Sequence, residues 1–527
     1  MRKSLLVATA LAAIAAAVLL LFRPPSTDAA PARDAVLAIQ TDLRRSASVD
    51  DEVLPSPDRP PNIVLVVADD LGWRDVGYHQ SEIRTPTIDR LAGAGVTLGR
   101  FYAHPTCSPT RAALMTGRSP LRLGILNPLS KNNPTGLPLT ETTVATRLRD
   151  NGYQTALIGK WHLGPRNLSY HPNARGFDHF YGNLTGGVGY YDKVHGGGYD
   201  WQRNGKTVRE EGYTTHLLAE EAVRWIRGRD PDRPLFLYAA FGAPHLPNEA
   251  PPQSIALYSK IEDERRRLHA AMVSELDEAI RRIHQTIVEE GLERETLIWF
   301  LSDNGGMVPK NPLRHLPEPF FTPALEMRFG VDASPMFADF ARTNLRAGGS
   351  DNRPFRGGKQ TVLEGGVRVP SFLSWPGVLG PARFDYMATV QDVTPTLLKI
   401  AGVVDDAQSF DGRSLWTALR IDRPAPPLEF IVREAAVTDS TAVYRYPFKL
   451  ILRAGEPKQL YHLERDPLES ENILREEPRV VDELTQFFQE FPKGPEVSLP
   501  LQTVVDDPDY FGGEEDRTPW AEQAYRE

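Results

Sequence analysis

Four apolar runs, separated by stretches of helical periodicity, constrain the fold of this 527-residue chain more than any other feature. The runs are 63–67, 155–158, 234–240 and 296–301. Short, nearly uncharged runs of this kind are typical of strands that are buried on both faces. The stretches 140–151 and 271–290 lie between them, and the second has apolar residues close to a helical repeat. This alternation predicts an α/β fold with a large, mostly parallel sheet covered by helices on both faces.

Polar side chains that can bind metal or transfer protons follow each run. They are Asp69 and Asp70 after the first, Lys160 and His162 after the second, His245 after the third, and Asp303 and Asn304 after the fourth. Ligands of open α/β sheets bind where the carboxyl ends of the strands meet, so we expect these side chains in one site. A single strand-terminal aspartate often caps the next turn, but two adjacent aspartates are harder to explain in that way.

Four of these side chains offer only oxygen ligands: Asp69, Asp70, Asp303 and Asn304. No histidine accompanies them in the sequence. An oxygen-only set suits a hard divalent cation, calcium or magnesium, rather than zinc.

The only cysteine of the chain, Cys107, stands immediately before an expected helix. Ser108 can serve as the N-cap, and Pro109 suits the first helical position. Arg111 lies one turn on, where its guanidinium can fold back beside Cys107 to form an anion pocket. A lone cysteine is more often a small buried hydrophobe. A thiolate nucleophile would need a paired base, for which the neighbourhood offers only His104.

The spacing Cys-X-Pro-X-Arg from Cys107, with the run Ala-Ala-Leu-Met-Thr-Gly-Arg that ends at Arg118, resembles the sulfatase signature. The hexapeptide 159–164 resembles the second signature of the same family, and the resemblance extends from residue 62 to about 419. Segments 73–77 and 175–178 look most like the arylsulfatase B branch of the alkaline phosphatase superfamily. The resemblance implies that a formylglycine-generating enzyme oxidises Cys107 to Cα-formylglycine.

The resemblance also implies roles for the other residues. Residue 107 and the oxygen ligands Asp69, Asp70, Asp303 and Asn304 would bind calcium, with magnesium as the alternative. The residues expected around the formylglycine and the sulfate are Arg111, Lys160, His162, His245 and Lys359. In such a site the hydrated formylglycine attacks sulfur, His245 or Lys359 protonates the leaving alcohol, and His162 takes the proton that lets sulfate depart by elimination. The substrate is expected to be a sulfated small molecule or carbohydrate.

Two other functions stay open on the sequence. A phosphate or phosphonate ester hydrolase can use the same formylglycine and metal, because both anions are tetrahedral. A non-catalytic binder of sulfated glycans is disfavoured, because every expected residue is present.

Two segments could shape the substrate site. The segment 180–201 contains Tyr190, Tyr191, Tyr199 and Trp201, which could either contact sugar rings or cover the core. The insertion 307–352 could be a lid or a surface loop.

The remaining features set the boundaries and the location. Residues 1–32, with a basic start and the charge-free run 5–22, are expected to be a signal peptide or membrane anchor of a protein exported to the periplasm or beyond. A spacer (33–61), a catalytic domain (62–422) and a C-terminal subdomain with its tail (423–527) follow. The subdomain is expected to hold strands at 430–432, 442–444, 449–452 and 459–463 and a helix at 478–491. A net charge of −9 argues against a nucleic-acid partner.

Overall fold

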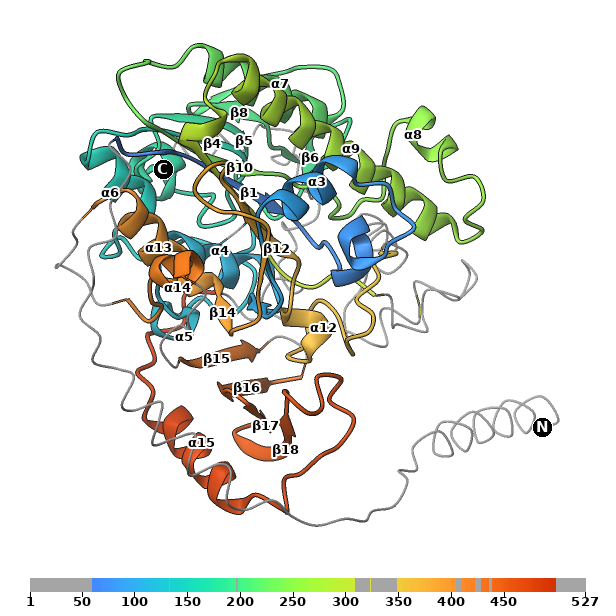
Figure 1. The fold of residues 1–527 in the computed structure, drawn as a ribbon, viewed down its shortest axis with the longest axis vertical. Coiled ribbons are helices and arrows are strands. Elements are labelled where there is room, and N and C mark those ends of the chain that lie inside the picture. Colours follow the sequence, from blue (N-terminus) through green and yellow to red (C-terminus); the bar gives the residue numbers. More distant parts are fainter. Residues whose placement is uncertain are drawn as a thin grey trace. The chain divides into compact units, whose positions relative to one another are not determined.

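The computed structural model describes residues 59–498, apart from 132, 196–197, 309–322, 324–347, 404–409, 422–427 and 436–437 (Figure 1). All described residues belong to one compact unit. The predicted signal or anchor (1–32), nearly all of the spacer and the centre of the 307–352 insertion lie outside these residues. So do the first residues of the predicted C-terminal subdomain (423–427) and its tail from 499. Within the described ranges, no helix combines the length and the apolar character needed to cross a membrane.

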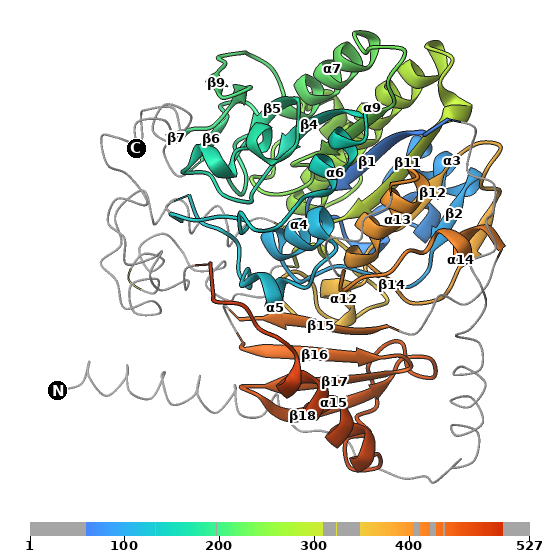
Figure 2. The same ribbon diagram turned by 90° about the vertical axis from the view of Figure 1, so that its left-hand side faces the viewer.

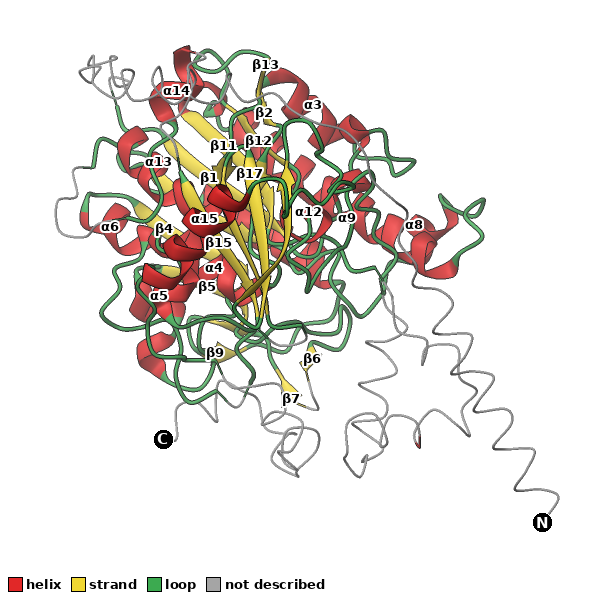
Figure 3. Cartoon of the chain, turned by 90° about the horizontal axis from the view of Figure 1, so that it is seen from below, coloured by secondary structure: helices red, strands yellow, loops and turns green. Residues whose placement is uncertain are grey.

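The four predicted strands form the centre of a ten-stranded sheet (Figure 3). They are β1 (Asn62–Ala68), β4 (Gln154–Lys160), β10 (Leu235–Ala240) and β11 (Thr296–Ser302). The order β11-β1-β10-β4 continues to β5 (His179–Asn183), and all five strands are parallel. The predicted α/β class is therefore confirmed, and the carboxyl ends of these strands meet at one edge.

Most of the pairing at the two margins of the sheet is antiparallel, so the sheet is mixed. The marginal strands are β12 (Ser371–Ser374), β2 (Val96–Leu98) and β13 (Ala382–Phe384) on one side, and β8 (Gln202–Arg203) and β9 (Lys206–Thr207) on the other. At the second margin the antiparallel pairing of β8 and β9 has a local cause. Asn204 and Gly205 both have positive φ, +49° and +77°, and form the two-residue turn that joins antiparallel β8 and β9.

Helices cover both faces of the sheet, as the apolar runs predicted (Figure 2). Along β1 the side chains alternate between two core clusters, because Ile63, Leu65 and Val67 point to one face and Val64 and Val66 to the other. The first face carries α4 (Cys107–Thr116), α6 (Val144–Asp150), α13 (Val393–Ile400) and α14 (Trp416–Ile421). The second carries α3 (Pro86–Ala94), α7 (Thr214–Arg227) and α9 (Glu264–Glu289).

Two helix boundaries differ from the predicted ones because of their caps. The helix expected at 271–290 starts earlier, at Glu264, where the Asp263 carboxylate accepts hydrogen bonds from the amides of Arg265 and Arg266. The helix expected at 140–151 starts later, at Val144, where the hydroxyl of Thr143 accepts from the amide of Thr146.

The C-terminal region forms a separate antiparallel sheet of four strands with a helix on one face. The strands are β15 (Glu429–Glu434), β16 (Ser440–Arg445), β17 (Phe448–Arg453) and β18 (Glu456–His462), and the helix is α15 (Pro478–Glu490). All five predicted elements are confirmed. The other face of this sheet packs through Phe430 and Tyr444 against Tyr102 and Val367 of the larger part. The division at 422/423 stays a prediction.

Shorter elements complete the described fold. They are β3 (Phe101–Tyr102), β6 (Val194–His195), β7 (Gly198–Tyr199), β14 (Ala388–Thr389), α5 (Pro120–Leu123), α8 (Pro252–Ala256) and α12 (Glu364–Val367).

Candidate active site

The ends of β1 and β11 bring three buried carboxylates together. Ala68 and Ser302 are paired in the sheet, so Asp69, Asp70 and Asp303 follow neighbouring strand ends. The amide of Asp70 donates to Asp303 Oδ1 over 3.3 Å, and all three aspartates are at most 2% exposed. Asp70 has φ +67°, a left-handed conformation that few side chains adopt without cost. Several buried carboxylates in such a small space require cations close by.

Three basic side chains supply part of that positive charge. Lys160 Nζ lies 2.5 Å from Asp69 Oδ2, Lys359 Nζ lies 2.8 Å from Asp70 Oδ2, and Arg111 contacts Asp303. Although burial opposes it, Lys160 together with His245 and Arg111 holds the pKa of Asp69 far below its usual range. Burial, reinforced by the charge of Asp69, raises the pKa of Asp303 to about 6. Arg111 compensates part of this charge through two hydrogen bonds to Asp303 Oδ2.

Cys107 lies at the start of α4, with its side chain directed at this cluster. Its thiol donates to Asp69 Oδ1 over 3.5 Å, and the residue is 2% exposed. Burial, followed by the charge of Asp69, raises the thiol pKa to about 12. These surroundings therefore favour the thiol over the more nucleophilic thiolate.

The predicted cap of α4 is wrong by two residues. The N-cap is Thr106, and Cys107 itself occupies the first helical position. Ser108 does not cap, because its hydroxyl donates to the carbonyl of His162 over 2.9 Å and accepts from the amide of Leu129. Pro109 falls inside the first turn, where its missing N–H costs no helical hydrogen bond.

Arg111 is held by Asp303 and by the carbonyl of Lys160. Its Nε and Nη2 donate to the same oxygen of Asp303, at 3.0 and 2.8 Å, and its Nη1 donates to the carbonyl of Lys160 at 2.9 Å. The helix therefore places positive charge in the site, where the guanidinium contacts a carboxylate and also interacts electrostatically with Cys107.

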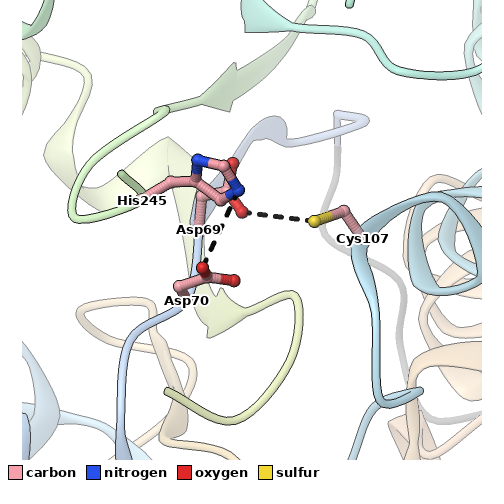
Figure 4. Close-up of side chains that lie close together, drawn as sticks. All are labelled: Asp69, Asp70, Cys107 and His245. Atoms are coloured by element: carbon pink, nitrogen blue, oxygen red, sulfur yellow. Dashed lines mark hydrogen bonds and ion pairs between the residues drawn. The ribbon is translucent and has the colours of Figure 1, made fainter. Parts of the chain in front are cut away.

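The cluster fits a divalent cation. Ligand atoms of Asp69, Asp70, Cys107 and His245 all lie within 4.8 Å of one another (Figure 4). Asn304 Nδ2 donates to Asp70 Oδ1 at 2.7 Å, whereas its buried Oδ1 accepts no hydrogen bond from the described residues. An orphaned buried carbonyl beside three carboxylates is a group that a hard cation would satisfy.

The expectation that no histidine accompanies the carboxylates is corrected by His245. Its Nε2 lies 3.8 Å from Asp70 Oδ2, and its Nδ1 lies 2.8 Å from the carbonyl oxygen of Leu246. A carbonyl only accepts, so Nδ1 carries the proton. Burial, followed by the charge of Lys359, lowers the pKa of His245 to about 4, which keeps the ring neutral near pH 7.

His162 joins the site less directly. Its Nε2 lies 3.0 Å from the carbonyl oxygen of Leu129, so this nitrogen holds a proton and Nδ1 is the basic atom. His162 has φ +59° at the end of β4, and its carbonyl accepts the hydrogen bond from Ser108. Nine of the ten predicted side chains are thus linked through the carboxylates, whereas His162 is connected through its carbonyl to the hydroxyl of Ser108, the residue after Cys107.

The structure adds residues that the sequence did not single out. Tyr238 places its hydroxyl 3.5 Å from Arg111 Nη1, and Ser302 Oγ donates to the carbonyl of Asn304. A tyrosine inside the apolar run 234–240 and a serine before Asp303 were detectable signals. Gly186 is different, because a Cβ there would lie 2.8 Å from the ring of His162, a proximity that only the fold reveals.

The aromatic residues of segment 180–201 serve different purposes. Trp201 is 2% exposed and donates to the hydroxyl of Tyr181 over 3.0 Å, and Tyr190 is 3% exposed with its hydroxyl on the carbonyls of Gly242 and His245. Both rings belong to the core and line a small cavity of about 20 Å³ beside Lys160 and His245. Tyr191 is 47% exposed, so it alone of these three keeps a free face.

Comparisons with known proteins agree with this geometry. The family model described as Sulfatase matches residues 61–403. Mouse arylsulfatase J is 32% identical over 382 residues, which are 70% of this chain and 58% of that protein. Rat N-acetylgalactosamine-6-sulfatase is 32% identical, covering 69% of this chain and 68% of that protein. Among solved structures, Ps i-CgsB in complex with k-i-k-neocarrahexaose superposes with a TM-score of 0.73 at 28% identity, over 87% of this chain and 99% of the other.

Proposed function

The chain belongs to the sulfatase family, and on that basis we propose that it hydrolyses a sulfate monoester on a carbohydrate. The observation that carries the proposal is the position of Cys107, whose side chain reaches Asp69 inside a buried cluster of carboxylates, lysines and arginine. A formylglycine at residue 107, as the sulfatase family generally uses, would supply the nucleophile at this position.

Formylglycine made from Cys107 and a bound divalent cation fit this site. Residue 107, Asp69, Asp70, Asp303 and Asn304 would hold the cation, and the orphaned Oδ1 of Asn304 supports that set. Bound there, calcium or magnesium would neutralise sulfate charge and acidify the attacking hydroxyl of the hydrated aldehyde. The oxygen-rich donors favour calcium over zinc.

The protein's own side chains divide the remaining work. The ammonium groups of Lys160 and Lys359 contact the carboxylates of Asp69 and Asp70. Once these carboxylates bind metal, both ammonium groups would bind sulfate oxygens. Arg111 holds Asp303 in place. His245 keeps its proton on Nδ1 toward Leu246 and presents Nε2 to the centre of the site, where the negative sulfate would favour its protonation and transfer to the leaving oxygen.

His162 supplies the complementary base. Its Nε2 is fixed on the carbonyl of Leu129, which leaves Nδ1 as the atom that would accept a proton from residue 107 during release of sulfate. His162 lies shortly after Lys160, the last residue of β4. The lysine that would bind a sulfate oxygen and the histidine that would take the proton therefore come from one short segment.

A carbohydrate substrate is supported by two of the similar proteins. One is named for N-acetylgalactosamine and another was solved with k-i-k-neocarrahexaose. The exposed Tyr191 offers a flat face on a segment whose neighbouring rings line a cavity beside Lys160 and His245. A formylglycine-generating enzyme is the partner that maturation requires.

Location is proposed from the N-terminal sequence. The basic start and the uncharged run 5–22 support export. We propose that membrane attachment, where it occurs, is through this run. Cell fractionation of the full chain, with and without residues 1–32, tests this: export predicts that the body leaves the cytoplasm only when these residues are present.

Paired assays test the proposed activity against its rival. Matured, calcium-loaded protein is given the same aryl leaving group as a sulfate and as a phosphate ester, and then a panel of sulfated sugars, with Cys107→Ala as the control. We expect faster hydrolysis of the sulfate and release of sulfate from at least one sugar. Faster phosphate hydrolysis would favour the phosphate or phosphonate ester hydrolase, and binding without turnover would favour the glycan binder.

A further inference from the structure

A fully buried lysine on the small C-terminal sheet is paired with two carboxylates. Lys449 lies in β17, and its Nζ is 3.0 Å from Glu364 Oε1 and 2.6 Å from Glu469 Oε1. All three side chains are completely shielded from solvent. Tyr102 and Tyr444 donate their hydroxyls to the two oxygens of Glu364, at 2.9 and 3.3 Å. Buried charges are tolerated when they are paired and hydrogen-bonded in this way.

Both ends of the loop that carries Lys359 are attached to this network. Glu364 starts α12, and its amide donates to Glu469 Oε2 over 3.0 Å. At the other end, the guanidinium of Arg356 donates to the carbonyl of Glu469, and the carbonyl of Arg356 accepts from the amide of Gly365 at 2.7 Å. The loop 356–365 is therefore closed on itself and held by residues of the C-terminal region.

The same loop, with the residue that follows it, is attached to the turn after Asp303 and Asn304. The amide of Lys359 donates to the carbonyl of Gly306 over 3.1 Å, and the amide of Gly305 donates to the carbonyl of Gly366 over 2.9 Å. A Cβ at Gly305 would lie 2.0 Å from the carbonyl oxygen of Gly365, so the two backbones are in direct contact. A shift of the loop would move Lys359 and disturb the turn after Asn304 together.

We propose that Lys449 is a positioning residue for the reaction: through Glu364 and Glu469 it fixes the loop 356–365, and thereby the place of Lys359 beside Asp70. The C-terminal sheet then contributes to catalysis from a distance, since Lys449 touches neither substrate nor metal. This inference rests on the proposed sulfatase activity for its kinetic test, but its structural test is independent of activity.

The structural test measures hydrogen exchange in the full chain. Lys449→Met removes the shared cation from two buried carboxylates, although Glu364 keeps an ion pair with Arg368 at 3.6 Å. The paired variant Lys449→Met/Glu469→Gln is therefore made beside it. The paired variant keeps the net charge of the three side chains at −1, as in the wild type (+1 − 2 before, −1 after). Leu484→Ala is the matched control, because Leu484 is fully buried under the opposite face of the same small sheet.

We expect faster exchange of the amides of Gly305 and Lys359 in the paired variant, and wild-type exchange of these amides in Leu484→Ala. Unchanged exchange at both amides in the paired variant would overturn the inference, whatever the protein hydrolyses.

The kinetic test asks whether Lys449 acts through Lys359. At temperatures well below each unfolding midpoint, we expect kcat of the paired variant to fall about tenfold or more and that of Leu484→Ala to stay near the wild-type value. In a Lys359→Met background the same paired change should then lower kcat only slightly further. A positioning role would be contradicted if the paired change lowered kcat by the same factor with and without Lys359→Met, or if the paired variant kept the wild-type kcat. A wild type that hydrolyses no sulfate ester would instead refute the proposed function and leave the exchange result standing.

Discussion

Arg111 and Asp303 are 192 residues apart in sequence and form a completely buried ion pair in which two guanidinium nitrogens donate to one carboxylate oxygen, at 3.0 and 2.8 Å. Arg111 comes from the helix that begins with Cys107, and Asp303 follows strand β11. The pair therefore joins the segment with the proposed nucleophile to the segment with the proposed metal ligands. It couples the stability of the fold to the geometry of the site.

Arg111→Met is expected to destabilise metal-free protein by about 3–5 kcal/mol, because it leaves Asp303 buried without its main partner. Thermal unfolding gives the measurement. Arg122→Met is the control, since Arg122 pairs with Asp411 at 2.7 Å but is partly exposed, and such pairs contribute up to about 1 kcal/mol. Similar losses in the two variants would show that the buried pair has no special importance.

Removal of metal is expected to abolish turnover, and calcium or magnesium should restore it where zinc does not. Asn304→Ala should raise the calcium concentration needed for half-maximal activity by about tenfold, roughly 1.4 kcal/mol, because it removes the orphaned Oδ1. The proximity of His245 makes this a demanding test, since histidine favours zinc. Stoichiometric zinc in active protein would disprove the oxygen-ligand account.

Substitutions at Tyr191 and Trp201 should have different effects. Trp201→Ala removes a buried ring and should reduce the free energy of unfolding by about 3–5 kcal/mol. It should therefore lower the unfolding midpoint and the activity on every substrate. Tyr191→Ala removes a half-exposed ring and should lower kcat/KM on a sulfated sugar by about tenfold while sparing a small aryl sulfate. An equal loss on both substrates for Tyr191→Ala would assign this ring to the structure as well.

Gly186→Ala tests the support of His162. The added methyl group would lie 2.8 Å from ring atoms of His162, so the ring must move. We expect kcat to fall about tenfold or more with little change in the unfolding midpoint. Gly242→Ala is the matched control, because a Cβ there meets no atom within 4 Å. If the two alanine variants have the same kcat, the position of the His162 ring does not limit the reaction.

The sequence predicted the parts of the fold that depend on local patterns. The central strands and the small C-terminal sheet follow from apolar periodicity, and their parallel order placed Asp69, Asp303 and Lys160 at one edge. The N-cap of α4 was wrong because Ser108 has a tertiary partner, the carbonyl of His162, that no local rule indicates. For Trp201 the sequence left open whether the ring contacts sugars or covers the core, and its burial beside Tyr181 assigns it to the core. The network of Lys449 with Glu364 and Glu469 joins segments far apart in the chain, so only the structure shows it.

The central claim is that residue 107, converted to formylglycine, is the nucleophile in the hydrolysis of a sulfate ester. The most direct measurement is kcat/KM on an aryl sulfate for wild-type protein and Cys107→Ala, with the conversion of residue 107 followed by peptide mass in the same preparations. The account predicts activity in proportion to the converted fraction and a loss of at least about a thousandfold in Cys107→Ala, with an unfolding midpoint close to that of the wild type. Activity that persists in Cys107→Ala, or that is independent of conversion, would contradict it.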